Sequence, residues 1–290
     1  MSIHKFLNVI TNCLNGLRTG YNYYILLIFL DKYTMQVYNI DTVYASANHA
    51  LQSELTEVLS MYRYETHLHT SEGSACSDST ASEMARKYKD EGYTGIIVTD
   101  HFFNGNTCID LSLPWEKKVH EYCKGYEHAR ETGAKIGLDV FFGVEYGNGA
   151  SDFLVYGIDE TWLTENNDIM EMEPTVFLEY VRSCGARVFQ AHPFREAPYI
   201  RGTIHCPLFV DGIEIYNASH RDPKFNERAK IYAEWYDLPV TGGSDSHNTT
   251  DRFYPGGVLS PRRFTSALDY ADAVIAGEIE VLTPPPPSKK

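Results

Sequence analysis

The strongest constraint on the fold is an alternation of short apolar segments with longer helical segments from residue 62 onward. The apolar segments are rich in Val, Ile, Phe and Tyr, which is typical of strands buried on both faces. We expect strands at residues 64–69, 95–99, 140–145, 153–156, 188–191, 212–216 and 239–241. Helices are expected between them, at residues 82–90, 114–132, 175–183, 222–236 and 265–276. About seven strand–helix units in roughly 230 residues predict an α/β fold with parallel strands, and they suit a barrel better than an open sheet.

Imidazoles and carboxylates stand at the ends of five expected strands. In chain order they are His67 and His69, Asp100 and His101, Glu145, His192, and Asp245 and His247. Because a strand alternates faces with period 2, the paired members of the first and last groups point the same way. The carboxyl ends of barrel strands share one rim, so we expect these side chains to converge there. Mixed nitrogen and oxygen donors without a thiolate pair suit Zn²⁺, Mn²⁺ or Fe²⁺ better than Ca²⁺.

The acidity of the chain limits its partners. Its 290 residues contain 25 Lys and Arg against 39 Asp and Glu, a net charge of −14. Nucleic acids and anionic membranes require a cationic surface, so we expect no bulk binding of either. A small anionic substrate remains suitable, because metal ions or a few arginines supply local positive charge. The six cysteines are scattered without a CxxC pair, which favours reduced thiols and a cytoplasmic location.

Residues 1–60 lie outside the alternating pattern. Their apolar run at 24–30 is shorter than the roughly 20 residues of a membrane helix, and no cleavage pattern stands close enough for a signal peptide. We expect an N-terminal extension at 1–60, a catalytic domain at 61–283 and a loose Pro-rich tail at 284–290. Since every motif follows Met61, the domain should fold and bind metal without the extension.

Taken in order, the motifs are His67-Leu68-His69-Thr70, Thr99-Asp100-His101, Glu145, His192-Pro193 and Gly243-Ser244-Asp245-Ser246-His247. This ordered set resembles the polymerase and histidinol phosphatase (PHP) superfamily over about residues 62–283. The resemblance implies a distorted seven-stranded (β/α) barrel, two or three divalent metal ions and phosphoester hydrolysis. The metal ligands that it implies are His67, His69, His101, Glu145, His192, Asp245 and His247. Residues 192–195 and 211–218 look most similar to the stand-alone, histidinol-phosphatase-like branch.

Two positions depart from the family pattern. The family usually has an Asp or His in the loop after the HxH motif, where this chain offers Glu72, Cys76 and Asp78. An ungapped count from the following helix places Cys76 there, but we favour the carboxylate of Glu72 as the ligand. The family also often has a His where this chain has Asp152. Asp binds the same ions, so the site is retained.

Three more residues are candidates for the reaction. Arg195 follows the His192-Pro193 pair and suits a forked contact with two phosphate oxygens. Its alternative is an ion pair with Glu196 or another neighbour. Arg201 in the same loop is a second candidate for substrate binding. Asp100 is assigned to the catalytic site, where we expect it to orient a ligand histidine.

The expected activity is that of a phosphatase acting on small phosphomonoesters. Two ions about 3.5–4 Å apart would bridge a hydroxide for in-line attack. Histidinol phosphate, phosphotyrosine, nucleotides and sugar phosphates are all candidate substrates. Three alternatives remain open: a phosphodiesterase or exonuclease on oligonucleotides, a metal-binding regulatory module without catalysis, and an amidohydrolase, which also begins with HxH in a barrel.

Overall fold

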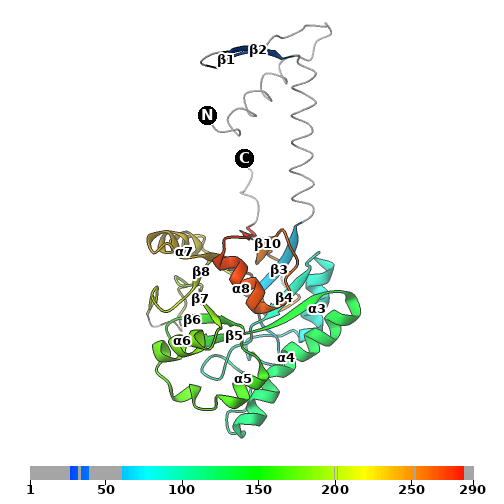
Figure 1. The fold of residues 1–290 in the computed structure, drawn as a ribbon. Helices are drawn as coiled ribbons and strands as arrows, with labels where there is room; N and C mark the ends of the chain where they lie inside the picture. The colour runs from blue at the N-terminus through cyan, green and yellow to red at the C-terminus, as the bar shows by residue number, and fades with distance from the viewer. Residues whose placement is uncertain are drawn as a thin grey trace. The chain divides into compact units, whose positions relative to one another are not determined.

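The computed structural model describes residues 61–283, except 199, 201, 251 and 252, and the backbone of residues 27–31 and 34–38. The chain divides into two compact units, Met1–Ser60 and Met61–Lys290. In the first unit the described part is an antiparallel pair of strands, β1 (Leu27–Asp31) and β2 (Thr34–Tyr38). The second unit contains all the motifs (Figure 1). Arg201 and the expected tail at 284–290 lie outside the described residues.

The second unit is built on a nine-stranded sheet that curves into a nearly closed barrel, with the strand order β11-β10-β3-β4-β5-β6-β7-β8-β9. The strands are β3 (Tyr62–Leu68), β4 (Gly95–Val98), β5 (Asp139–Gly147), β6 (Asp152–Tyr156), β7 (Arg187–Ala191), β8 (Gly212–Asn217), β9 (Val240–Gly243), β10 (Val258–Ser260) and β11 (Glu280–Val281). The barrel closes where Asp245 N donates to His67 O at 2.7 Å and His69 N donates to Ser246 O at 3.0 Å. All seven expected strands are present, and the predicted α/β barrel is confirmed.

One strand departs from the expected parallel order. β6 is antiparallel to both β5 and β7, whereas the other neighbours from β3 to β9 are parallel. Only residues 148–151 connect β5 to β6. A parallel crossover needs about a dozen residues, so this short connection permits only an antiparallel pair. The reversal brings the first residue of β6, Asp152, to the rim where the parallel strands end.

Helices lie around the sheet (Figure 1). They are α3 (Ala81–Asp90), α4 (Trp115–Ile136), α5 (Glu160–Glu165), the 3-10 helix η1 (Ile169–Glu171), α6 (Pro174–Ser183), α7 (Lys224–Trp235) and α8 (Ala267–Ile275). A capping box formed by Thr80 and Glu83 begins α3, rather than the expected Ser82. α4 continues through Gly133, its expected end, and stops at Gly137, whose φ of 70° is the left-handed conformation that favours glycine.

Apolar packing occupies the interior of the barrel below the rim. Leu154, Tyr156 and Phe189 from the sheet pack in one cluster with Tyr270 and Ala271 of α8. Two further clusters fill the spaces between the sheet and the surrounding helices. The polar side chains are therefore concentrated at the opposite end, the C-terminal rim. Of the helices in the described part of the chain, none combines the length and the apolar character of a membrane span.

Candidate metal centre

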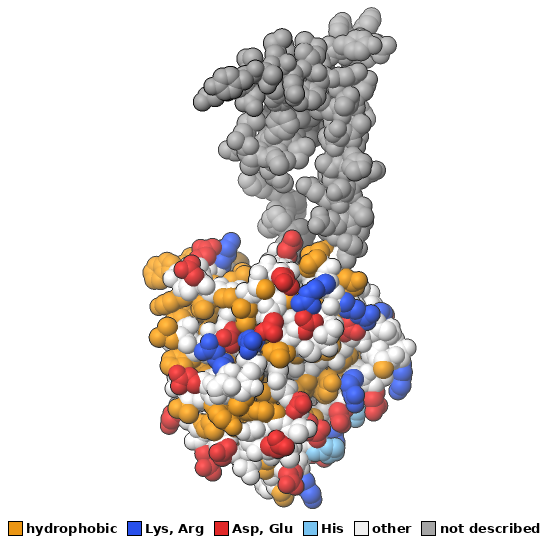
Figure 2. All heavy atoms as spheres, in the orientation of Figure 1, with side chains coloured by type: hydrophobic (Ala, Val, Ile, Leu, Met, Phe, Trp, Pro, Cys, Tyr) orange, Lys and Arg blue, Asp and Glu red, His pale blue; other side chains and the backbone are white. Residues whose placement is uncertain are grey.

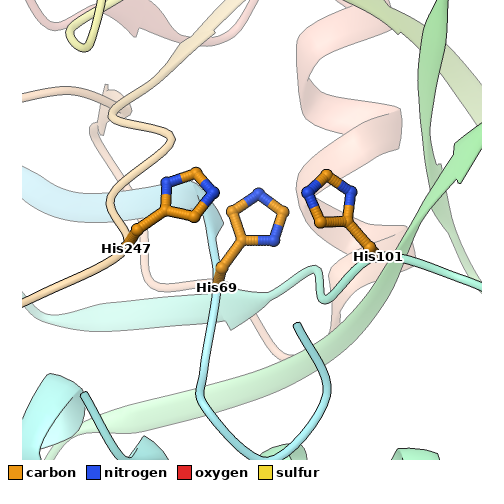
Figure 3. A group of neighbouring side chains, drawn as sticks. All are labelled: His69, His101 and His247. Carbon is orange, nitrogen blue, oxygen red and sulfur yellow. The ribbon is translucent and has the colours of Figure 1, made fainter. Parts of the chain in front are cut away.

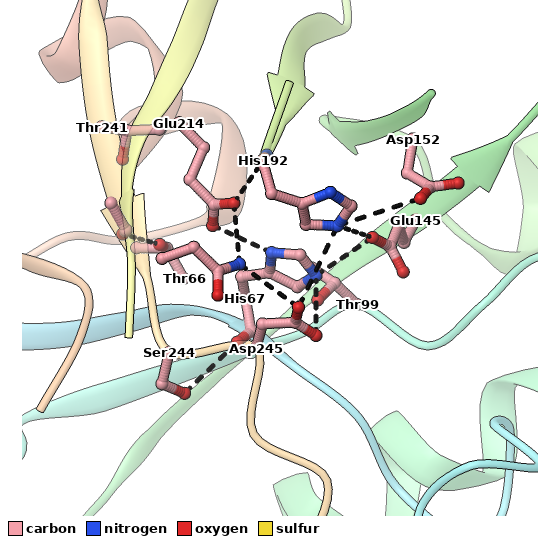
Figure 4. A network of polar contacts seen from close by, with 12 residues as sticks. Thr66, His67, Thr99, Glu145, Asp152, His192, Glu214, Thr241, Ser244 and Asp245 are labelled. Carbon is pink, nitrogen blue, oxygen red and sulfur yellow. Dashed lines mark hydrogen bonds and ion pairs between the residues drawn. The ribbon is translucent and has the colours of Figure 1, made fainter. Parts of the chain in front are cut away.

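The C-terminal rim brings together side chains from four strands (Figure 4). β3 carries His67 and is followed by His69, β5 carries Glu145, and His192 and Asp245 follow β7 and β9. All five residues are at most 5% exposed. Buried charged and imidazole groups need polar partners, and here they are one another's partners. The predicted convergence at one rim is therefore observed for these residues.

Three of these side chains, His67, His69 and Asp245, have donor atoms within 4.8 Å of one another, and Glu145 lies beside them. His67 Nε2 lies 3.2 Å from Glu145 Oε1 and 3.6 Å from Asp245 Oδ1. His69 Nε2 lies 3.3 Å from His67 Nε2, 3.4 Å from Glu145 Oε2 and 3.2 Å from Asp245 Oδ1. A tetrahedron with metal–ligand distances of about 2.0–2.2 Å has edges of about 3.3–3.6 Å. The spacing of His67, His69 and Asp245 therefore fits three positions of one tetrahedral ion. We call these three side chains, with the adjacent Glu145, the deep site.

A second group shares Glu145 with the deep site. His192 Nε2 lies 3.1 Å from Glu145 Oε1 and 3.9 Å from Asp152 Oδ2. Donor atoms of His67, Glu145 and His192 all lie within 4.8 Å of one another. Asp152 reaches this group because β6 runs in the reverse direction. Glu145 thus belongs to both groups, and Asp152 lies beside the second group.

A third group lies on the other side of His69. Donor atoms of His69, His101 and His247 lie within 4.8 Å of one another (Figure 3). The His69 ring lies between the other two, with ring centroids 4.4 Å from His101 and 4.3 Å from His247. The side chains of His101 and His247 are 16% and 26% exposed, so this group lies nearer to solvent than the deep site.

The charge at the deep site suits a cation. Burial alone would lower the pKa of His67, but Glu214, Asp245 and Glu145 raise it well above its usual value. These carboxylates place excess negative charge around the imidazole, and a divalent ion held by the same side chains would neutralise it.

Asp100 acts behind the centre rather than in it. Its carboxylate accepts hydrogen bonds from Thr70 N and Thr70 Oγ1, both at 2.6 Å, and from Ser74 Oγ at 2.7 Å. Ser74 Oγ in turn lies 3.1 Å from His69 Nδ1. Burial raises the pKa of Asp100 to about 6, although these hydrogen bonds oppose the rise. Asp100 is therefore placed to orient His69 through Ser74.

Glu72, the favoured ligand in the loop after the HxH motif, points away from the centre. Its Oε2 accepts a hydrogen bond from Ala81 N in the first turn of α3 at 2.9 Å, and its Oε1 lies 3.1 Å from His128 Nδ1 of α4. The start of α3 offers unpaired N–H groups, which attract this carboxylate. Cys76 of the same loop lines the cavity described below, whereas Asp78 is exposed.

Arg195 lies between the deep site and solvent. Its guanidinium pairs with Asp245 Oδ2 and donates to Asn217 Oδ1 at 3.3 Å. Glu196, the alternative partner, pairs with Arg228 instead. Burial alone would raise the pKa of Asp245, but Arg195 is the strongest of the positive groups that hold it well below its usual value. The arginine is therefore held beside a charged candidate ligand.

The centre opens into a cavity of about 530 Å³. One part of its wall is formed by rim side chains, namely Cys76, His101, Asp152, His192, Arg195 and His247. Loop residues that include Gly147, Ser151, Ile200 and Thr203 line another part. Sites for small molecules commonly measure about 300–1,000 Å³, so the cavity has room for a small substrate.

Two candidate ligands adopt a backbone conformation that is rare outside glycine. The φ angles of His192 and Asp245 are 27° and 53°. Such conformations cost about 1–3 kcal/mol each and persist where surrounding bonds impose them. Asp245 N donates to His67 O at 2.7 Å, and His192 N donates to Glu214 Oε2 at 2.9 Å. Both strained residues are thus held by hydrogen bonds to the strands that carry the centre.

Sequence analysis missed Glu214, Ser74 and Asn217, all of which orient the centre. Glu214 Oε1 lies 2.9 Å from His67 Nδ1, and Glu214 Oε2 accepts from Asn217 Nδ2 at 3.0 Å. The carboxylate accepts a hydrogen bond from Nδ1–H, so in the neutral ring the Nε2 lone pair of His67 is directed at the deep site. The sequence did contain a signal for Glu214, because a glutamate inside an otherwise apolar strand must find a polar partner when it is buried.

Similarity to known proteins agrees with this architecture. Residues 223–251 match the sequence model of the PHP_C family, described as PHP-associated. No protein with a curated description matches the chain by sequence. A two-domain protein from Bacteroides vulgatus containing a predicted PHP-like metal-dependent phosphoesterase has a similar fold, with a TM-score of 0.60 and 15% identity. The similarity covers 77% of this chain and 65% of that one, so this chain spans less than two thirds of that protein.

Two further structures show weaker similarity. An amidohydrolase from Chromobacterium violaceum, solved with sulfate and no metal, has a TM-score of 0.45 and 12% identity, covering 76% of this chain and 98% of that one. A histidinol phosphate phosphatase from Lactococcus lactis, complexed with zinc, L-histidinol and phosphate, has a TM-score of 0.36 and 15% identity, covering 74% and 93%. The sequence match is confined to residues 223–251, and the Bacteroides protein shares the fold of this chain.

Proposed function

We propose that this chain is a metal-dependent phosphatase of small phosphomonoesters. The observation that carries the proposal is the donor set of His67, His69 and Asp245, which lie 3.2–3.6 Å apart. Glu145 lies beside this set, and the guanidinium of Arg195 pairs with Asp245. Imidazole and carboxylate donors suit zinc, manganese or iron ions. Metal ions and an arginine together complement the charge of a phosphate ester.

Different residues would bind the metal ions and the substrate. The four side chains of the deep site would hold one ion, and Glu145, His192 and Asp152 would hold a second. Bound divalent ions would supply Lewis acidity and an activated water. Arg195 donates N–H groups toward phosphate oxygens and stabilises the charge that develops on them. Asp245 Oδ2 fixes the orientation of that guanidinium.

The cavity and the charge of the chain favour a small monoester over an oligonucleotide. A volume of about 530 Å³ accommodates a small molecule. The face seen in Figure 2 carries acidic side chains interspersed with basic ones rather than a continuous basic stripe, and the net charge of the chain is −14. A strand of nucleic acid is bound along a positively charged groove with stacking aromatic side chains. Histidinol phosphate, phosphotyrosine, nucleotides and sugar phosphates all remain candidate substrates.

Hydrolysis of generic substrates tests the proposal. Metal-free protein is reconstituted with Mn²⁺, Zn²⁺ or Fe²⁺ and assayed on p-nitrophenyl phosphate and on bis(p-nitrophenyl) phosphate. We expect hydrolysis of the monoester that a chelator abolishes. His67→Ala and Asp245→Ala should lose metal and turnover together. His128→Ala is the matched control, because His128 contacts Glu72 outside the centre and should keep both.

Other outcomes would favour the alternatives. Hydrolysis of the diester alone would indicate a phosphodiesterase. Tight metal binding without hydrolysis of any phosphoester would indicate a regulatory module, and hydrolysis of amides instead would indicate an amidohydrolase. Each of these results would refute the proposed phosphatase.

A further inference from the structure

Three side chains lie at the outer edge of the centre. They belong neither to the deep site nor to the group formed by His67, Glu145 and His192. Cys76, His101 and His247 come from different loops, and all three line the cavity. We propose that Cys76 binds a divalent metal ion as a thiolate, together with His101 and His247, so that the outer position of this centre has a sulfur ligand. The inference rests on the metal-dependent function proposed above, but its test requires no turnover.

The loop that carries Cys76 is fixed on both sides. Ala75 N donates to Asn106 O at 2.9 Å, in the segment that follows β4. Asp78 N donates to His247 O at 3.0 Å, in the segment that follows β9. These backbone bonds join the loop to the two segments that supply the imidazoles. Cys76 is therefore placed between them by the fold rather than by its own side-chain contacts.

The two imidazoles are oriented to receive a cation. His101 Nδ1 lies 2.7 Å from Glu145 Oε2, and His247 Nδ1 lies 2.9 Å from the backbone oxygen of Asp245. The oxygen accepts a hydrogen bond from Nδ1–H, so Nε2 of each neutral ring carries the lone pair that binds metals. Glu145 thus contacts His101 through one oxygen and takes part in the deep site. The outer position is adjacent to the deep site, and one carboxylate links them.

The thiol is placed to reach both imidazoles. The side chain of Cys76 forms hydrogen bonds with His101 and His247. The thiolate is the form of cysteine that binds metals. No disulfide competes for this sulfur among the described residues, since Cys76 and the other described cysteines are free.

A sulfur ligand changes which metals the outer position prefers. Two imidazoles and a thiolate form a donor set that suits zinc, with iron and cobalt as related choices, whereas manganese and magnesium prefer oxygen. Glu72, which would have supplied oxygen here, is bound to α3 and His128. The deep site has two imidazoles and two carboxylates and no sulfur. The centre would therefore contain two positions with different metal preferences.

Alkylation protection tests the sulfur directly in the full-length protein. Metal-free protein is treated with iodoacetamide with and without Zn²⁺, and the modified cysteines are located by mass spectrometry. We expect zinc to slow the modification of Cys76 by about tenfold or more, because a bound thiolate is no longer a free nucleophile. Cys108 is an internal reference: it is exposed and its Sγ donates to Glu72 O at 3.1 Å, so its rate should be unchanged. Equal rates for Cys76 with and without zinc would overturn the proposal.

Cobalt spectroscopy and a ligand exchange provide the second test. The Co²⁺-loaded protein should show thiolate-to-cobalt charge-transfer absorption in the near ultraviolet, which Cys76→Ser should lose and Cys108→Ser should keep. Cys76→Asp replaces sulfur by oxygen and should lower the ratio of zinc to manganese affinity at one site by about tenfold. A charge-transfer band that survives in Cys76→Ser, or is absent from cobalt-loaded wild type, would contradict the proposal. Zinc protection without phosphatase activity would refute the proposed function alone.

Discussion

The replacement Glu214→Gln tests how the barrel prepares His67 for metal. In the structure, Glu214 Oε1 lies 2.9 Å from His67 Nδ1, while Glu214 Oε2 accepts from His192 N at 2.9 Å and from Asn217 Nδ2 at 3.0 Å. Every group that faces this buried carboxylate is a donor. Glutamine has the same size, but it offers one acceptor oxygen and an NH₂ group that only donates.

Either orientation of the new amide leaves a mismatch. If its oxygen accepts from His192 N, the NH₂ group faces His67 Nδ1 and favours the tautomer with the proton on Nε2, the nitrogen that faces the deep site. If its oxygen faces His67, the NH₂ group opposes the two donors of His192 and Asn217. Loss of such an orienting partner typically costs about 10–100-fold in metal affinity, or about 1.4–2.8 kcal/mol.

The assay is competition with a chromogenic chelator, which reports the Kd of each ion that binds. We expect the tightest Kd of Glu214→Gln to rise about 10–100-fold. Asp139→Asn is the control, because Asp139 pairs with Arg263 at 2.7 Å and with Tyr64 OH at 3.0 Å, away from the histidines. It should lose stability but bind metal normally. A folded Glu214→Gln protein with metal affinity within about twofold of wild type would refute the reasoning, since one lost orienting bond costs more than that.

Three further predictions concern the centre and its surroundings. Arg195→Ala should lower kcat/KM on phosphomonoesters by about 10–100-fold with normal metal content, because it removes a charge-assisted contact, and Arg195→Lys should recover only part; loss of metal as well would show that Arg195 mainly holds Asp245. Removing metal with a chelator should lower the melting temperature by about 5–11 °C if the ion was present at about 100 times its Kd, and an unchanged melting curve would argue against a metal in the native fold. Glu72→Gln should cost about 0.5–1 kcal/mol of stability, because Ala81 N loses a charged acceptor at the start of α3; a fall in metal content, measured by elemental analysis, would restore Glu72 as a ligand.

The strands could be predicted from the sequence because their signal is local. A run of β-branched and aromatic residues indicates a strand wherever it lies, and period 2 decides which residues share a face. The relation of His67 to His69 follows from this alone. The order of the motifs along the chain then indicated the rim and the PHP resemblance, and a protein with a predicted PHP-like phosphoesterase has a similar fold.

In the loop after the HxH motif, local sequence patterns could not predict which residue reaches the metal centre. Glu72 and Cys76 are both close to His69 in sequence, and both are chemically suitable ligands. The loop folds through hydrogen bonds to residues far along the chain, such as Asn106 and His247. Those bonds place Cys76 at the cavity, while Glu72 turns to the start of α3. The ungapped count from the following helix pointed to Cys76, but the ligand chemistry of the loop residues alone does not distinguish the two.

The sequence by itself determined which residues carry the chemistry and at which strand ends they stand. Only the tertiary structure decided which of them meet. The reversal of β6 brought Asp152 to the rim, and the closure of the barrel placed Glu214 of β8 behind His67 of β3. The physical reason is that backbone geometry sets a residue's direction within its own strand, whereas contacts between strands depend on chain reversal and on closure across the whole sheet.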